Sequence, residues 1–229
     1  MNQIGEKMKI IARIYTDFNE KFGIPRQSGI TENEAKIIFE PEYRRKEAFV
    51  GIEGYSHLWI IWQFSEAIRD EWSPTVRPPR LGGNKRVGVF ATRSPFRPNP
   101  IGLSSVALRS IEYTKELGPV LTVCGADILD GTPIYDIKPY LSYTDSHPEA
   151  TGGFSDGVRK YKINVVFSDD LLEKIDTGLR HDRITLLEND PRPSYKKDSE
   201  KEYGMKFSHY EIFFTVIDNT LTVTRVDLL

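Results

Sequence analysis

SHLWIIWQF, residues 56–64, is the stretch that decides the fold. It is mostly apolar and aromatic, which predicts a strand buried on both faces. No long amphipathic helix alternates with the strand-like runs around it, which argues against a doubly wound, Rossmann-type parallel sheet. The sequence therefore predicts a mainly β protein, with an antiparallel barrel or sandwich. The other runs are Met8–Tyr15, Ala35–Phe39, Arg86–Ala91, Leu103–Tyr113 and Val120–Ala126.

A polar stretch at residues 144–158 predicts a boundary between a first domain, 1–145, and a small C-terminal α+β domain, 159–229. In the second domain we expect a strand at Ile163–Phe167. A helix capped by Ser168 should follow and end at Gly178, and a second helix should cover Asp182–Glu188. The last segment is typical of a hairpin that turns at Asp218 and Asn219.

The composition is that of an ordinary globular protein: 229 residues, with a formal net charge of −2. Cys124 is the only cysteine, which excludes an internal disulfide and fits a reducing compartment. The N-terminal residues lack a signal-peptide core, and the longest apolar run, Leu58–Trp62, is too short for a bilayer. We therefore expect a cytoplasmic protein without membrane contact. The four histidines have no metal-ligand spacing, so no metal is expected, and His57 is interpreted as a core residue.

The densest unusual segment is RSPFRPNPIG, Arg93–Gly102, which we call the arm. Its three prolines fix φ and predict a stiff, extended chain that holds Arg93 and Arg97 at small entropic cost. Arginine suits planar anions such as carboxylates and phosphates. The same pattern is equally typical of a proline-stiffened surface loop with solvated arginines.

Positive charge gathers just before the arm, and the sequence has no acidic residue between Val76 and Ile111. Such a segment in a near-neutral protein favours contact with nucleic-acid phosphates, although many charge runs are only solvated loops. The candidate phosphate-binding residues before the arm are Arg77, Arg80, Lys85 and Arg86.

Three aspartates, Asp127, Asp130 and Asp136, follow in ADILDGTPIYDIKP. Asp130 precedes a glycine and is typical of a turn. Asp127 and Asp136 lie among apolar neighbours, so each needs a partner, and we expect the arm to supply one. A magnesium-dependent phosphate-ester hydrolase is a weaker alternative, because it would need clustered carboxylates. The residues alone do not specify a reaction.

Several motifs resemble the TrmO (TsaA-like) family. They are PRQSG (25–29), GIEGYSHLWI (51–60), RPPRLGG (77–83), GVFATRSPFRPNPIG (88–102), DGTPIYDIKPYL (130–141) and DPRPSY (190–195). The resemblance covers nearly the whole chain. It implies a β-barrel, S-adenosylmethionine-dependent tRNA methyltransferase that acts as a homodimer. The implied product is the N6-methyl form of N6-threonylcarbamoyladenosine at position 37, next to the anticodon.

The resemblance also implies a cofactor site, and its residues here are Gln27, Ser28, Gly29, Ile30, Ser65, Glu66, Arg93, Pro98, Asn99, Gly102, Leu103, Cys124, Gly125, Ala126 and Asp127. The pair Ser65 and Glu66 departs from the bulkier polar pair of some bacterial members. A non-catalytic RNA-binding or S-adenosylmethionine-sensing barrel is the alternative function, and methyl-transfer turnover would separate the two.

Methyl transfer to a urea-like nitrogen requires alignment of the acceptor and can require a general base. The candidate bases are Asp136 and Tyr135, with Tyr143 as a further alternative, and nothing in the sequence selects among them. Arg97 or Arg80 would bind the carboxylate of the threonylcarbamoyl group.

Overall fold

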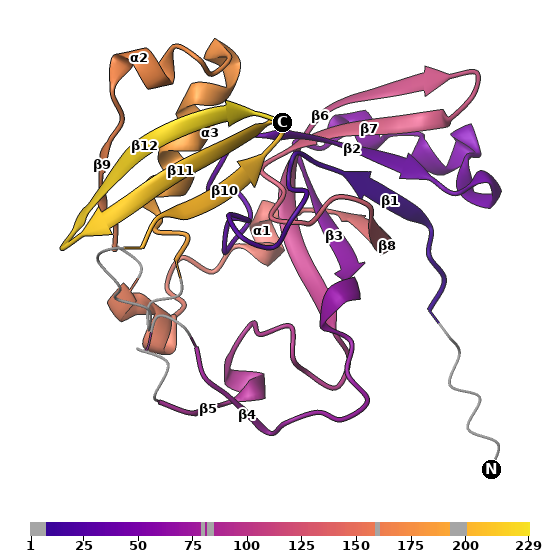
Figure 1. Cartoon of the computed structure of the whole chain (residues 1–229). Helices are drawn as coiled ribbons and strands as arrows, with labels where there is room; N and C mark the ends of the chain where they lie inside the picture. Colours follow the sequence, from indigo (N-terminus) through magenta and orange to yellow (C-terminus); the bar gives the residue numbers. More distant parts are fainter. Residues whose placement is uncertain (1–7, 79–80, 82–84, 159–160, 193–200) are drawn as a thin grey trace.

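The computed structural model describes residues 8–78, 81, 85–158, 161–192 and 201–229. These residues form a closed antiparallel barrel and, beside it, a second sheet (Figure 1). The mainly β architecture predicted from the sequence is confirmed. The barrel strands, in their order around the barrel, are β1 (Ala12–Tyr15), β2 (Glu34–Phe39), β7 (Gly118–Cys124), β6 (Ile101–Thr114), β3 (His57–Gln63) and β8 (Thr132–Pro139).

Strand β3 has one buried face, not two as predicted. Leu58, Ile60 and Trp62 are buried in the barrel, whereas Trp59 and Ile61 on the other face are only half-buried. The reason is geometric, since a barrel strand has one interior side and its side chains alternate. His57 faces outward at the start of β3 and is exposed, so its interpretation as a core residue was wrong.

Two other strands differ from the sequence prediction. Strand β8, which closes the barrel between β1 and β3, was not among the strands expected from the sequence. The prediction of a strand at Arg86–Ala91 was wrong. Only Val87–Gly88 (β5) is a strand, paired with Thr75–Val76 (β4), and Val89–Ala91 forms a 3₁₀ turn. In β6, Gly102 lies opposite Trp62, and a Cβ there would overlap the indole ring.

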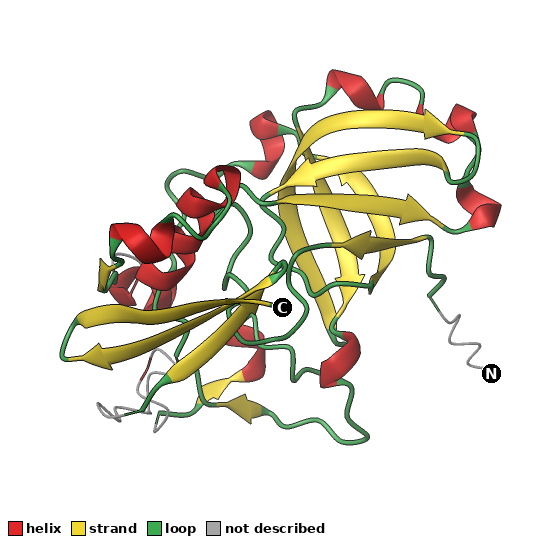
Figure 2. Ribbon diagram, turned by 45° about the horizontal axis from the view of Figure 1, so that its top comes forward, coloured by secondary structure: helices red, strands yellow, loops and turns green. Residues whose placement is uncertain are grey.

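The C-terminal unit consists of a four-stranded sheet with helices on one side (Figure 2). The hairpin predicted at Asp218 is confirmed, and Asp218 has a φ of +52°. Gly178 lies in the first turn of α3 and does not end the preceding helix, so that prediction was wrong. The elements are β9 (Asn164–Val166), α2 (Asp169–Leu172), α3 (Thr177–Glu188), β10 (Tyr203–Phe207), β11 (Tyr210–Ile217) and β12 (Thr220–Leu228).

The barrel and the C-terminal unit have separate apolar cores. The barrel core includes Ile14, Ile60 and Leu121, and the second core lies between α3 and the C-terminal sheet. Phe18, three residues after the end of β1, is buried in the second core and packs against Phe207 with ring centroids 5.0 Å apart. The connection between β1 and β2 therefore leaves the barrel, packs against the C-terminal unit and returns.

Short elements connect the strands. Among the described helices, none has the length and apolar character needed to cross a membrane. The remaining elements are α1 (Ser142–Asp145) and the 3₁₀ turns Pro41–Tyr43, Lys46–Phe49, Ile52–Gly54, Ser65–Ala67 and Gly153–Val158.

Candidate functional site

Two connections meet at one end of the barrel: the loop of residues 25–33, which leads into β2, and the loop that follows β7. The amide of Gly29 donates to the carbonyl of Gly125 at 2.9 Å, and the amide of Gly125 donates to the carbonyl of Asn33 at 3.1 Å. Gly125 has a φ of +80°, and a Cβ there would lie 3.2 Å from the backbone of Gly29. This close approach requires glycine and brings residues 27–30 next to residues 124–127.

Asp127 has the most unusual environment at this end of the barrel. Burial raises the pKa of its carboxyl group, and the hydrogen bond from Ser104 and the charge of Arg93 oppose that rise. The hydroxyl of Ser104 donates to Oδ1 of Asp127 at 2.5 Å and accepts a hydrogen bond from Nε1 of Trp62 at 3.0 Å. Asp127 is therefore connected to the barrel interior through Ser104, which is buried.

Arg93 joins the arm to the 25–33 loop. Its Nη1 donates to Oε1 of Gln27 at 2.5 Å, and both side chains are otherwise exposed. The charge of Arg93 opposes the rise in the pKa of Asp127, but the hydrogen-bond partner of Asp127 is Ser104, so the partnership expected between the arm and Asp127 stays a prediction. We call Gln27, Arg93, Ser104 and Asp127 the Asp127 cluster.

The arm is fixed by hydrogen bonds as well as by its prolines. Nη1 of Arg97 donates to the carbonyl of Thr92 at 3.1 Å, and Oγ1 of Thr92 donates to the carbonyl of Val89 at 2.8 Å. At its far end, the carbonyl of Pro100 accepts from the amide of Phe64 at 2.8 Å. These hydrogen bonds therefore hold the arm in place at the end of the barrel, so it is not a free surface loop.

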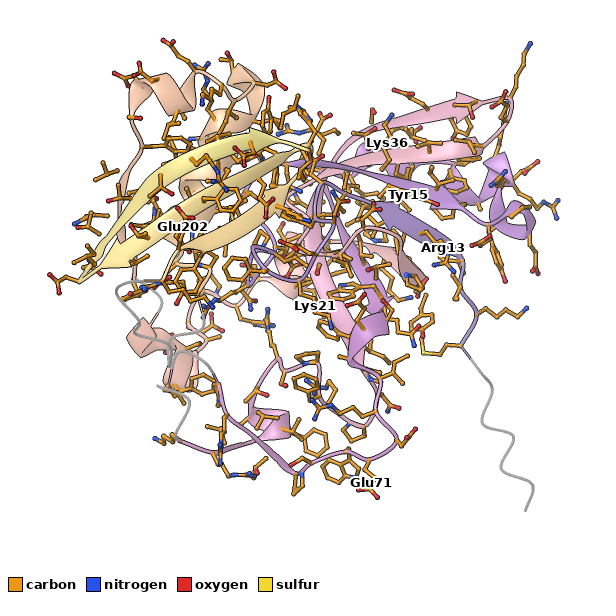
Figure 3. The ribbon with its side chains drawn as sticks, in the orientation of Figure 1. Arg13, Tyr15, Lys21, Lys36, Glu71 and Glu202 are labelled. Atoms are coloured by element: carbon orange, nitrogen blue, oxygen red, sulfur yellow. The ribbon has the colours of Figure 1, made fainter. Side chains whose placement is uncertain are left out.

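Three further cofactor candidates, Glu66, Leu103 and Cys124, have surroundings that the structure describes. Glu66, in the turn after β3, forms an ion pair of 3.0 Å with Lys21, which is labelled in Figure 3. Leu103, next to Gly102, is 56% exposed, which is high for a leucine in a barrel strand. Cys124 is buried and its sulfur accepts a hydrogen bond from Nε of Arg109 at 3.2 Å.

Asp136 lies on β8 and does not have the partner expected for it. Its carboxylate pairs with Lys138, with Oδ2 and Nζ 2.8 Å apart, and not with the arm. Oδ1 accepts a hydrogen bond from the amide of Ile137 at 2.9 Å. Burial raises the pKa of Tyr135, which disfavours its phenolate form. Among the described residues, no hydrogen bond or ion pair joins either side chain to the Asp127 cluster, and their catalytic role stays a prediction.

The three aspartates do not gather as a metal site. Asp130 caps the chain at Thr16, whose amide donates to its Oδ1 at 2.9 Å, and Asp136 pairs with Lys138 as described above. Across the described part of the chain, no group of three histidine, cysteine, aspartate or glutamate residues could hold a metal ion. This arrangement removes the main support for the hydrolase alternative.

Three of the basic residues lie on a projecting segment, which we define by its described residues 68–78, 81 and 85–92 and which extends away from the barrel between β3 and β6 (Figure 1). Arg77, Lys85 and Arg86 are exposed there, and Nη1 of Arg86 donates to Oγ1 of Thr75 at 2.7 Å. Arg80 lies outside the described residues. Trp72 and Phe90 are also exposed, with ring centroids 6.1 Å apart. The segment therefore combines cations with accessible aromatic rings.

The barrel wall also carries two open hollows of about 240 and 340 Å³. Neither is lined by a residue of the Asp127 cluster. A carboxylate with a pKa shifted by burial, next to an arginine and glycine-rich loops, is a stronger sign of function than an open hollow. We therefore place the candidate site at the Asp127 cluster.

Comparison with known proteins identifies the family. The family model of the tRNA-methyltransferase O N-terminal domain matches residues 13–146, and that of the TrmO C-terminal domain matches residues 160–228. The chain belongs to the TrmO family. The resemblance deduced from the sequence motifs is thereby confirmed, and the protein is an enzyme of a methyltransferase family.

Individual TrmO relatives agree with this assignment. The tRNA (adenine(37)-N6)-methyltransferase of Escherichia coli K12 is 38% identical over 217 residues, which cover 91% of this chain and 92% of the relative. A putative S-adenosylmethionine-dependent methyltransferase of Pseudomonas aeruginosa PAO1 is 39% identical over 206 residues, 86% of each chain. A crystal structure of TrmO from P. aeruginosa is 28% identical and superposes over 100% of both chains with a TM-score of 0.79.

The sequence prediction missed two residues of the candidate site. Ser104 and Trp62 connect Asp127 to the barrel, yet each lies in a run that was interpreted only as strand. The available signal was a serine at an inward-facing position of β6, between Gly102 and Val106. A polar side chain at such a position needs a hydrogen-bond partner, and here the partner is the carboxylate of the site.

Proposed function

We propose that this protein is an S-adenosylmethionine-dependent methyltransferase that methylates N6 of adenosine 37 in tRNA. We further propose that its acceptor is N6-threonylcarbamoyladenosine, that it acts in the cytoplasm and that it acts as a homodimer. The observation that carries the proposal is the Asp127 cluster, in which a half-buried carboxylate and an arginine lie beside two glycine-containing loops at the barrel end. Family membership and the names of the relatives supply the reaction class.

The chemistry of the Asp127 cluster fits S-adenosylmethionine. Arg93 suits its carboxylate, and Asp127 together with the amide oxygen of Gln27 suits its cationic groups. Gly29 has a φ of +75° with open space beside it, so its backbone can approach a ligand. The buried Nδ2 of Asn33, at the end of the same loop, has no hydrogen-bond partner among the described residues. When bound, S-adenosylmethionine supplies a methyl group activated by a sulfonium.

The residues of the site would then hold the acceptor nitrogen in line with this methyl group. They would also keep the carboxylate of Asp127 available to accept a proton. Ser104 orients Asp127, and the raised pKa of Asp127 makes its ionised form a stronger proton acceptor than an ordinary aspartate. Asp127 is therefore the base that we favour, and Asp136 and Tyr135, the bases predicted from the sequence, are the alternatives. A base must reach the reacting nitrogen directly or through one water, so comparing substitutions at Asp127 and Asp136 decides between them.

The tRNA would approach the projecting segment. Arg77, Lys85 and Arg86 are exposed there and suit backbone phosphates, and we extend this proposal to Arg80. The guanidinium of Arg97, held by the carbonyl of Thr92, is proposed to bind the carboxylate of the threonylcarbamoyl group.

The test is methyl transfer from labelled S-adenosylmethionine to two tRNAs of identical sequence, one with and one without the threonylcarbamoyl group. We expect transfer to N6 of the modified tRNA, with roughly 10⁴-fold discrimination if Arg97 binds its carboxylate. Equal rates on both tRNAs would contradict the proposed acceptor. Binding of both ligands without any transfer would favour the non-catalytic alternative.

A further inference from the structure

The 25–33 loop is held near both of its ends by the C-terminal unit. Before residues 27–30, Nη2 of Arg26 donates to the carbonyl of Asp190 at 3.3 Å and to that of Arg192 at 3.2 Å. After them, the amide of Glu32 donates to Oδ1 of Asp182, on α3, at 2.8 Å. The proposed cofactor residues therefore lie between two attachments to a unit far away in the sequence.

The turn that receives Arg26 is itself rigid. Asp190 is 6% exposed and has a φ of +48°, which a non-glycine residue adopts only when its surroundings hold it there. Arg192 binds the carboxylate of Asp190 in a bidentate pair, with Nε 2.9 Å from Oδ1 and Nη2 3.1 Å from Oδ2. The hydroxyl of Tyr161 adds a contact of 3.3 Å to Oδ2. The carbonyls that bind Arg26 are thus fixed in place.

The chain that leads into the loop is also anchored in the C-terminal unit. Phe18 is buried in the second core, and Phe22 and Ile24 pack against it. Asp182 itself is 5% exposed, so its contact with Glu32 is shielded from water. On the barrel side, the loop has the contacts between Gly29 and Gly125 and between Gln27 and Arg93.

We infer that Arg26 and Asp182 are positioning residues, through which the C-terminal unit places Gln27 and Ser28 against the barrel and sets the affinity for S-adenosylmethionine. This inference rests on the proposed function. A binding loop that is already ordered loses less conformational entropy when its ligand binds, so loosening either attachment weakens binding. The C-terminal unit then completes the cofactor site without contacting the cofactor.

The test uses the full-length chain and two matched pairs of variants. Asp182→Ala removes the acceptor for Glu32, whereas Asp182→Asn keeps an oxygen at that position. Arg26→Ala removes the other attachment. Arg180→Ala is its control, because Nε of Arg180 bonds the carbonyl of Ile175 at 2.9 Å within the C-terminal unit. Calorimetric titration with S-adenosylmethionine, melting temperature and amide hydrogen exchange of residues 25–33 are measured for each variant.

We expect Asp182→Ala, which removes one hydrogen bond, and Arg26→Ala, which removes two, each to weaken binding at least roughly fivefold and to speed exchange in the 25–33 loop without ligand. Asp182→Asn should stay within about twofold of the wild type, and Arg180→Ala should lower only the melting temperature. Unchanged loop exchange in both alanine variants would overturn the positioning role. Faster exchange with unchanged affinity would overturn its link to binding. Failure of the wild type to bind S-adenosylmethionine would instead refute the proposed function, while loop exchange still reports on the attachments.

Discussion

The hydroxyl of Ser104 donates a hydrogen bond of 2.5 Å to Oδ1 of Asp127. This bond connects an inward-facing residue of a barrel strand with the carboxyl group of the proposed cofactor site. It stabilises the ionised form of Asp127, whereas burial of the carboxyl group raises its pKa more strongly. The protonation state of Asp127 therefore depends on two opposing effects, and substitution or a change of pH can alter it.

Asp127→Asn should weaken S-adenosylmethionine binding without unfolding the protein. Asparagine keeps the acceptor for Ser104 but loses the negative charge, and we expect at least a tenfold loss of affinity, about 1.4 kcal/mol. Because the folded pKa is raised, the stability linked to protonation of Asp127 is complete below its unfolded pKa and is lost as pH rises through the folded pKa. The variant should therefore melt no lower than the wild type at neutral pH.

Calorimetric titration and melting curves between about pH 4 and pH 8 measure both effects, since this range starts near the ordinary pKa of aspartate. Wild-type affinity in the variant would remove Asp127 from the cofactor site. A much lower melting temperature at neutral pH would show that the charge stabilises the fold.

Arg93→Ala should lower the affinity for S-adenosylmethionine by roughly 1.5–3 kcal/mol, the range for a lost hydrogen bond to a charged group. Its guanidinium connects the arm to Gln27 and contributes charge near Asp127. Arg13→Ala is the matched control, because Arg13 lies on β1 and pairs with Glu40 at 3.6 Å (Figure 3). Equal affinities for wild type, variant and control would exclude Arg93 as a ligand-binding residue.

Joint replacement of Lys85 and Arg86 by alanine should weaken tRNA binding and flatten its dependence on salt. Each lost phosphate contact removes close to one unit of slope in a plot of log affinity against log salt. Lys36→Ala is a suitable control, because this lysine lies on β2 of the barrel wall (Figure 3). The same slope in the double variant and the wild type would place the phosphates elsewhere.

Asp136→Asn should reduce kcat far less than Asp127→Asn does. Asp136 is paired with Lys138, and the hydrogen bond and charge of Asp136 raise the pKa of Lys138. A general base commonly contributes about 10²–10⁴-fold to the rate. Single-turnover methyl transfer measures the step directly. A loss of that size in Asp136→Asn alone would establish Asp136 as the base and assign Asp127 to binding only.

Most of the barrel is predictable from the sequence because its strands are apolar runs separated by glycine and proline. Strand β8 was missed because Thr132, Asp136 and Lys138 give it a polar appearance, and its apolar residues fall near the DGTP turn. Periodicity could not show that β3 has one buried face, since Trp59 and Ile61 are apolar although they face outward. Their position depends on closure of the barrel, which is a long-range property.

The candidate site was predictable where its residues lie in unusual local sequence. The arm stands out because proline restricts the backbone, and the loop glycines stand out because glycine allows conformations that other residues rarely adopt. The partners of the aspartates did not stand out. Asp136 pairs with Lys138, two residues away on the same strand, and Asp127 pairs with Ser104, which is 23 residues away. Such pairing depends on strand register, which a single sequence does not reveal.

The burial of Phe18 against Phe207 has a consequence for synthesis on the ribosome. The amide of Ser208 donates to the carbonyl of Asp17 at 2.9 Å, so residues near 17 need partners near 207. The connection between the first two barrel strands therefore cannot reach its final packing until translation has passed β10. At roughly 5–20 residues per second, this early segment waits on the order of ten seconds or more for its partners, exposed to chaperones and proteases meanwhile.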